Sequence, residues 1–387
     1  MSPIPLLMLA QTDVTHNTRN TKSRHSAPLF TNSGRDLPSG GKYVRLTVMQ
    51  KREAERVDEL CQRHCAFALY APPGETGEHF CMAEDGRTEP DFRCNRGFLS
   101  ATFTGERLFI PAELKEPPTP NNWKKMRKHP HTPATTRQQY AALFRLYTEF
   151  IRRGQIHKIV LARTEDYPVA PTFSPYTAFR KACEQHPSAF KALVHTPQHG
   201  TWLFCTPEQL ITGKGETWHT MALAGTRPPS TQTWDSKNTR EQALVTEFMR
   251  EVLTPLADSI SISAPETLRA GNVEHICSRF LLRMPSERLS SVLEQLPPTP
   301  AVCGFPVPTA RKLLLSTPDI DRSCYAGYLG MRDTDSVQLY VALRCMQIFP
   351  ECCRLYAGGG LMPDSEEESE WQETVAKMRT MRDILSE

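Results

Sequence analysis

The spacing of apolar residues divides the chain into helical and extended stretches. Between Thr136 and Arg153 the apolar side chains recur at helical spacing, which predicts an amphipathic helix. Further helices are predicted over residues 50–69, 239–256, 272–281 and 366–385. Extended apolar runs predict strands near residues 156–167, 190–195, 201–213, 216–224, 324–332, 336–347 and 353–358.

The strands between residues 324 and 358 follow one another with only short turns between them. Short turns join antiparallel strands, whereas parallel strands need a long crossover connection. The pattern therefore predicts an antiparallel sheet rather than a series of parallel strand–helix–strand units.

The two ends of the chain differ in character. Residues 11–42 are polar and rich in Thr, Asn, Ser and Arg. This composition predicts a disordered leader over residues 1–42, or an over-extended start of the chain. Folding is expected to begin near Tyr43. Residues 43–135 form the N-terminal part of the fold and carry little recognisable chemistry, whereas residues 136–387 form the domain with the candidate site.

Composition excludes several classes of partner. A formal net charge of +3 over 387 residues is too small to indicate a nucleic-acid partner. No apolar run approaches the roughly 20 residues of a membrane helix, so no membrane association is expected. The 12 cysteines are scattered without a zinc-ligand spacing, and Met1 to Ala10 lacks the basic residues of a signal peptide. We therefore expect a cytoplasmic protein with reduced thiols.

The most informative segment lies near the C-terminus. Gly358 to Gly360 predict a glycine-rich bend before a helix, where free backbone N–H groups can hold an anion. On that helix Glu370, Glu373 and Lys377 share one face. Two carboxylates and an ammonium beside an anion site suggest a metal ion that bridges an acidic substrate. The alternative is a solvated helix with surface ion pairs.

Two further ionisable residues lie at predicted strand ends. Lys158 opens a strand that is apolar on both faces, so a desolvated lysine with a lowered pKa could act as a general base there. The alternative is a lysine that reaches out to water. Glu208 follows Thr206-Pro207, and a carboxyl group held in a partly apolar site can stay protonated and act as an acid. Its alternative is an exposed turn glutamate.

A third carboxylate opens the helix after residue 237. Asn238 or Thr239 is the predicted cap, which puts Glu241 in the first turn, where the helix dipole favours a negative charge. That structural role explains Glu241 without any function. Only a pairing with Glu373 gives it a second role, because Mg²⁺ takes one or two carboxylates plus water and substrate oxygens.

Taken together, ten segments in this order resemble the chorismate-utilising enzymes, and among them the isochorismate synthases. They cover roughly residues 140–386. The segments are Lys158 to Arg163, Thr206 to Glu208, Ala222 to Pro228, Lys237 to Glu241, Val273 to His275, Pro298 to Val302, Tyr325 to Gly327, Val341 to Arg344, Leu355 to Gly358 and Glu370 to Lys377.

The resemblance implies an α+β fold in which a large antiparallel β-sheet system is flanked by helices around a central cleft. It implies that Glu241 and Glu373 hold Mg²⁺ on the ring carboxylate of chorismate, with Glu370 close by. Lys158 would activate a water for attack at ring C2, and Glu208 would protonate the departing C4 hydroxyl. The remaining implied contacts with substrate come from Arg344, Lys377, Gly358, Gly360, His275, Ala301 and Thr226.

Two positions separate branches of the family. Aminodeoxychorismate synthases commonly carry a lysine just before the Gly-Thr pair, where this chain has Ala224. Members that use ammonia usually carry an uncharged residue such as glutamine in place of Lys158. The chain also departs from the common pattern at four positions, which bear on the detail of the pocket: Gln242 and Pro297 replace histidines, and Cys303 and Gly359 replace other small residues.

The sequence therefore predicts an isochorismate synthase that feeds menaquinone or siderophore biosynthesis. A salicylate synthase, which goes on to eliminate pyruvate, and a non-catalytic chorismate-binding paralogue are the alternatives. No amidotransferase subunit is expected, because ammonia is not the nucleophile. The resemblance also implies a monomer.

Overall fold

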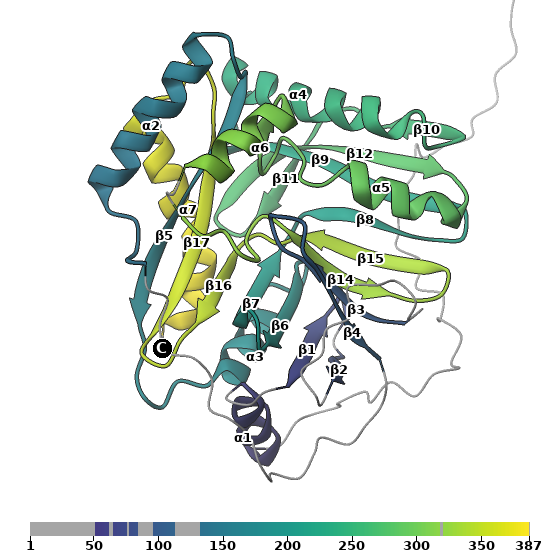
Figure 1. The fold of residues 1–387 in the computed structure, drawn as a ribbon, viewed down its shortest axis with the longest axis vertical. Helices are drawn as coiled ribbons and strands as arrows, with labels where there is room; N and C mark the ends of the chain where they lie inside the picture. Colours follow the sequence, from purple (N-terminus) through teal and green to yellow (C-terminus); the bar gives the residue numbers. More distant parts are fainter. Residues whose placement is uncertain are drawn as a thin grey trace, which may run out of the picture. The chain divides into compact units, whose positions relative to one another are not determined.

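The computed structural model describes residues 51–61, 65–75, 77–83, 96–112, 132–317 and 320–386. The predicted leader, residues 1–42, lies outside these residues. Two large sheets organise the described part of the chain (Figure 1). Every strand pair in them is antiparallel, as the short turns predicted.

The first sheet has eight strands in the order β13-β5-β17-β16-β7-β6-β1-β2. Their bounds are β1 Ala66–Ala71, β2 His79–Ala83, β5 Lys158–Pro168, β6 Phe190–Thr196, β7 Gly200–Thr206, β13 Gly304–Phe305, β16 Cys345–Ile348 and β17 Cys352–Leu361. The two longest strands of this sheet, β5 and β17, pair with each other and so join segments from the middle and the end of the chain.

The second sheet has nine strands in the order β10-β12-β9-β8-β15-β14-β3-β4, with β11 paired to β12. Their bounds are β3 Gly97–Ala101, β4 Arg107–Pro111, β8 Gln209–Lys214, β9 Thr217–Arg227, β10 Ser259–Ile262, β11 Glu266–Ala270, β12 Val273–Arg283, β14 Tyr328–Arg332 and β15 Ser336–Val341. The first four strands of the described chain therefore lie at sheet edges: β1 and β2 end the first sheet, and β3 and β4 end the second.

Helices flank the sheets: α2, α3 and α7 pack on strands of the first sheet, and α4 lies along β9 and β12 of the second (Figure 1). Their bounds are α1 Lys51–Leu60, α2 Arg137–Arg152, α3 Pro175–Gln185, α4 Ser236–Leu253, α5 Leu289–Gln295, α6 Val307–Ser316 and α7 Glu367–Leu385. In the described part of the chain, no helix is long and apolar enough to cross a membrane.

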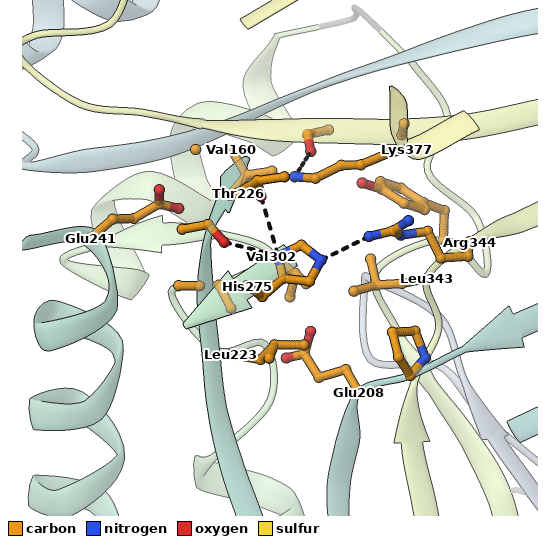
Figure 2. Close-up of a pocket in the computed structure, with 18 of the residues that line it drawn as sticks. Val160, Glu208, Leu223, Thr226, Glu241, His275, Val302, Leu343, Arg344 and Lys377 are labelled. Carbon is orange, nitrogen blue, oxygen red and sulfur yellow. Dashed lines mark hydrogen bonds between the residues drawn. The ribbon is translucent and has the colours of Figure 1, made fainter. Parts of the chain in front are cut away.

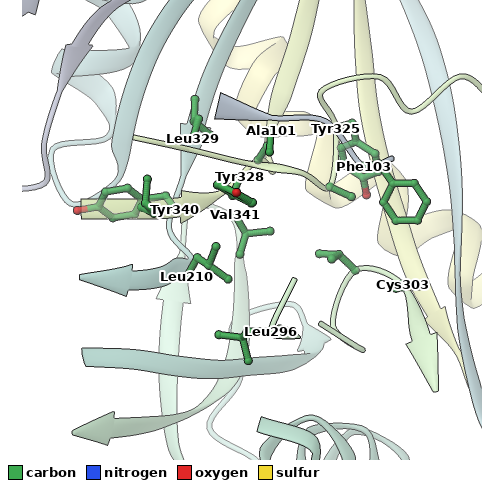
Figure 3. Packing of buried hydrophobic residues seen from close by; sticks show 14 of the residues in the cluster. Ala101, Phe103, Leu210, Leu296, Cys303, Tyr325, Tyr328, Leu329, Tyr340 and Val341 are labelled. Atoms are coloured by element: carbon green, nitrogen blue, oxygen red, sulfur yellow. The ribbon is translucent and has the colours of Figure 1, made fainter. Parts of the chain in front are cut away.

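The main hydrophobic core lies where side chains of the two sheets meet (Figure 3). Phe190 of β6 stacks on Tyr340 of β15 with ring centroids 4.4 Å apart, which joins the two sheets directly. A second cluster fills the space between the first sheet and helices α3 and α7, with Leu193 and Met378 among its buried members. An aromatic pair such as Phe190 and Tyr340 stabilises the fold by about 0.5 to 1.5 kcal/mol beyond the effect of the area that it buries.

One helix prediction was wrong, and a second was right only over its first half. The predicted helix over residues 272–281 is strand β12. Its apolar residues Val273, Ile276, Cys277, Phe280 and Leu281 happen to follow helical spacing, but β12 pairs with β9 on one side and with β10 and β11 on the other. One face of β12 is buried or half-buried throughout, and the other exposes only Arg279 and Arg283, so the strand shows little of the alternation that would reveal it.

The predicted helix over residues 50–69 ends at Leu60, and Gln50 lies outside the described residues. Residues 66–71 instead form strand β1, which lies between β2 and β6 in the sheet and has every residue buried. A short run that is apolar at every position fits an interior strand and gives no helical face. The strand predicted over 201–213 also divides, because Pro207 separates β7 from β8.

Candidate active site

One cavity is lined by residues from both sheets and from helices α4 and α7 (Figure 2). Among the residues that line it are most of the predicted site residues: Glu208, Thr226, Glu241, His275, Ala301, Arg344, Gly358, Gly360 and Lys377. Lys158, Glu370 and Glu373 do not line it but lie behind its wall, next to Gly359 and Gly360.

Glu208 lies between β7 and β8, where Pro207 ends the first strand. Its side chain is 4% exposed. Burial raises the pKa of Glu208 to about 8, against the opposing effect of Lys158, Lys377 and Arg344. The carboxyl group is therefore mostly protonated at neutral pH and can donate a proton. The alternative of an exposed turn glutamate is wrong.

Lys158 is the first residue of β5 and is completely buried, so the alternative of a lysine that reaches out to water is wrong. Its Nζ lies 2.9 Å from Oε1 of Glu241. Burial opposes ionisation of Glu241, but the charges of Lys158, Lys377 and Lys237 hold its pKa below the usual value. The base candidate and a metal candidate are thus an ion pair in this structure.

Helix α4 begins earlier than predicted. Asp235 is its cap, and Asp235 Oδ1 accepts a hydrogen bond of 2.8 Å from the Asn238 N–H. Glu241 therefore lies in the second turn, and the dipole effect expected for the first turn is weaker there. Asn238 is not the cap. Its Oδ1 accepts a hydrogen bond of 2.9 Å from the Thr226 N–H and so positions the end of β9 beside the cavity.

Gly358 to Gly360 do not form the predicted bend but lie inside β17, paired with β5. Gly360 pairs with Val160, whose N–H donates to Cys303 O and whose carbonyl accepts from Arg322. Main-chain groups of that pair therefore point away from each other. Strand β16 ends its pairing at Tyr356, so the Gly358 and Gly360 N–H groups open on the cavity. Anion binding there stays a prediction.

The glycines also make room for side chains. A Cβ on Gly360 would meet Glu241 Oε1 and lie 2.7 Å from Lys158 Cε. A Cβ on Gly359 would lie 2.9 Å from Glu370 Oε2 and 3.5 Å from Glu373 Oε1. The three carboxylates therefore approach neighbouring residues of one strand, which only glycine permits.

Each carboxylate of this group contacts a lysine. Glu373 Oε1 lies 2.6 Å from Lys377 Nζ, which also donates to Gly358 O at 2.9 Å. Glu370 Oε1 accepts from Lys237 Nζ and from Ser365 Oγ. Burial and the charge of Glu373 raise the pKa of Glu370 to about 7.

No group of three His, Cys, Asp or Glu side chains in the described ranges is arranged as a finished metal site. The donor set nevertheless fits a divalent cation. Glu370 Oε2 is buried and has no hydrogen-bond partner among the residues that the structure describes, and the neighbouring Glu373 supplies a second carboxylate. Hard oxygen ligands of this kind suit Mg²⁺.

Several residues that line the cavity received no role from the sequence. Tyr325 and Tyr356 stack with ring centroids 5.7 Å apart, and Leu223 and Leu343 add apolar surface. All four lie inside the segments that carry the family resemblance, so their position in those motifs was the available signal. Gln242 does not line the cavity; its Nε2 donates to Thr246 and Ser278.

Sequence comparison identifies the family of proteins that this chain resembles. A family model described as "Chorismate binding enzyme" matches residues 106–386. Isochorismate synthase MenF of Escherichia coli (strain K12) is 29% identical over 269 residues, which are 65% of this chain and 62% of that protein. Isochorismate synthase DhbC of Bacillus subtilis (strain 168) is 30% identical over 252 residues, 60% of this chain and 63% of that protein. The chain thus spans about three-fifths of the length of these relatives.

Comparison with solved structures finds the same fold in another protein. The solved structure of MenF, the menaquinone-specific isochorismate synthase from Escherichia coli, superposes with a TM-score of 0.70 at 21% identity, covering 84% of this chain and 89% of that one. The expected α+β architecture, a large antiparallel sheet system flanked by helices, is confirmed.

Proposed function

This chain belongs to the chorismate binding enzyme family, and we propose that it is an isochorismate synthase. The observation that supports the proposal is a pair of buried groups: Glu208, which lines the cavity and has its pKa raised to about 8, and Lys158, which lies behind the cavity wall beside Gly360. Adding water at one ring carbon and expelling hydroxide from another requires a base and an acid. The two relatives compared above, MenF and DhbC, are both named isochorismate synthases, which supports the same reaction.

Lys158 is the proposed base that takes a proton from the attacking water at ring C2. Glu208 is the proposed acid that protonates the leaving C4 hydroxyl, which leaves poorly as hydroxide. Each positioned proton transfer typically contributes ~10² to 10⁴-fold to the rate. A lysine in place of a neutral side chain favours water over ammonia as the nucleophile, so no amidotransferase partner is proposed.

Substrate binding is assigned to the polar groups of the cavity. The guanidinium of Arg344 and the ammonium of Lys377 are proposed to hold the two carboxylates of chorismate, together with the N–H groups of Gly358 and Gly360. Thr226, His275 and Ala301 would contact the rest of the substrate. A Mg²⁺ ion held by Glu241 and Glu373, with Glu370 beside them, would position a carboxylate and offset its charge.

Product analysis tests the proposal. The purified protein is incubated with chorismate and Mg²⁺, with and without ammonium, and the products are separated by chromatography. We expect isochorismate that accumulates reversibly and disappears on chelation. Salicylate with pyruvate would identify a salicylate synthase, and anthranilate formed with ammonium would contradict the role of Lys158. Unchanged chorismate would leave a binding protein.

The pathway is a second part of the proposal. Isochorismate from this protein would feed menaquinone or siderophore biosynthesis. Complementation of two bacterial strains, each lacking the isochorismate synthase of one pathway, separates the two routes. Growth of only one strain would assign the pathway, and growth of neither would contradict the proposed activity.

A further inference from the structure

Each carboxylate of the proposed metal site has one oxygen held by a lysine. Glu241 Oε1 is held by Lys158, Glu373 Oε1 by Lys377, and Glu370 Oε1 by Lys237. The three carboxylates share one neighbourhood, because Glu370 and Glu373 lie next to Gly359, and Glu241 lies next to the adjoining Gly360. Three lysines on three carboxylates leave each glutamate with one oxygen that no lysine occupies.

Lys237 differs from the other two lysines because the proposed mechanism does not use it. It lies in the first turn of α4, is 21% exposed and does not line the cavity. Ser365 Oγ donates to the same oxygen, Glu370 Oε1, at 2.6 Å. Glu370 itself is 1% exposed.

The two oxygens of Glu370 are therefore in different states. Oε1 has two donors, whereas Oε2 is buried beside Gly359 and receives no hydrogen bond within the described part of the chain. A cation that binds this carboxylate finds one oxygen available. Turning the carboxylate to offer both oxygens would break the contacts with Lys237 and Ser365.

We propose that Lys237 and Ser365 restrict Glu370 to a single ligand oxygen and so make the site select Mg²⁺ over Ca²⁺. Lys237 is a positioning residue in this scheme. The inference rests on the proposed function, because it concerns the metal site assigned there.

The physical reason is the difference between the two cations. Mg²⁺ is small and demands near-octahedral geometry, while Ca²⁺ is larger and accepts six to eight oxygens, including both oxygens of one carboxylate. Two oxygens of one carboxylate subtend too narrow an angle for two octahedral positions. A glutamate limited to one oxygen loses little for Mg²⁺ but loses a ligand for Ca²⁺.

Direct binding of the metal alone tests the inference. Calorimetry of the full chain with MgCl₂ and with CaCl₂ gives the two dissociation constants and their ratio. In Lys237→Met we expect the preference for Mg²⁺ over Ca²⁺ to fall by about tenfold, the lower end of the effects seen when groups behind a metal ligand are changed. Ser365→Ala removes one donor without a change of charge and should shift the ratio in the same direction by less.

Lys214→Met is the matched control. Lys214 also pairs with an acid, Asp335, but on the surface, and its removal changes the net charge equally. Its ratio should equal that of the original protein. If Lys237→Met changes the affinities for Mg²⁺ and Ca²⁺ by the same factor, the lysine acts only through its charge. If the ratio of the two dissociation constants is unchanged in both Lys237→Met and Ser365→Ala, the inference is overturned.

Ser365→Ala keeps the test valid if Lys237→Met does not fold. Chorismate turnover, measured on the same samples, separates this inference from the proposed function. A protein that forms isochorismate with no preference between the two cations overturns the inference and leaves the function standing. A protein that binds Mg²⁺ selectively without turnover contradicts the function instead.

Discussion

Nη2 of Arg344 donates a hydrogen bond of 2.9 Å to Nε2 of His275 at the wall of the cavity (Figure 2). Arginine has no acceptor, so Nε2 must be the unprotonated nitrogen. Nδ1 then carries the proton and donates to Gly225 O at 2.9 Å. Burial, with the charges of Arg344 and Lys377, holds the pKa of His275 well below its usual value, so the imidazole is neutral. The hydrogen bond to His275 orients the guanidinium of Arg344. The backbone of Arg344 lies in the left-handed region, with φ of +46°.

The first prediction concerns this orientation. His275→Phe leaves a buried guanidinium N–H of Arg344 without its acceptor, at a cost of about 1 to 3 kcal/mol. We expect KM for chorismate to rise by about tenfold or more while kcat falls less, because the proposed role of Arg344 is to bind the substrate and not to transfer protons. Steady-state kinetics measure the split, and His275→Gln, which can still accept a hydrogen bond, should recover part of the affinity. A loss confined to kcat would contradict the assignment.

The second prediction concerns the pH dependence of Glu208. An acid with a pKa of about 8 donates a proton only below that pH, so kcat should fall as pH rises through about 8. Glu208→Gln should lower turnover by ~10² to 10⁴-fold below pH 8 and should abolish the fall in kcat that the original protein shows above it. A rate that keeps rising above pH 8 would rule out Glu208 as the acid.

The same shift affects stability. The folded protein keeps a proton on Glu208 that the unfolded chain has already lost, so the free energy of unfolding contributed by this group decreases as pH rises from about 4.5 towards 8. Glu208→Gln removes this slope. Urea unfolding at pH 5 and pH 8 should show the variant gaining stability relative to the original protein at the higher pH.

The third prediction concerns the pair formed by Lys158 and Glu241. Lys158→Met leaves a buried carboxylate unpaired and should lower the free energy of unfolding by about 3 to 5 kcal/mol. Adding Glu241→Gln removes the unpaired charge and should recover most of this loss. Turnover should be absent from both variants, because the base is missing. Unfolding by urea and product analysis measure the two effects; near-normal turnover in Lys158→Met would sink the assignment.

The fourth prediction concerns Gly360. A methyl group there would meet Glu241 Oε1 and Lys158 Cε, both at the mobile ends of long side chains. Gly360→Ala should therefore displace the ion pair at a modest cost in stability but with a large loss of turnover. Thermal unfolding and kinetics on one preparation compare the two. Loss of folding with full specific activity in the folded fraction would mean that the glycine serves packing alone.

Local patterns were reliable where one face of an element meets the core. Helix α2 was predicted from its apolar spacing, and Thr136 caps it through a reciprocal pair of hydrogen bonds with Gln139. Strand β5 and helix α7 were also found close to their observed bounds. Predictions failed for β12, where only Arg279 and Arg283 are exposed and the alternation is weak. They also failed for the glycines of β17, because glycine has no side chain to mark a period and the pairing with β5 comes from a distant segment.

The sequence by itself determined which chemical groups the protein has: an acid, a base, three further carboxylates and their order in family motifs. Only the tertiary structure decided how these groups are paired. Lys237 and Glu370 lie 133 residues apart in the chain, and Lys158 meets Glu241 only because β5, β17 and α4 pack together. Periodicity reports the contacts of a segment with its own surroundings, whereas burial, pKa and the choice of partner depend on segments that folding brings from elsewhere.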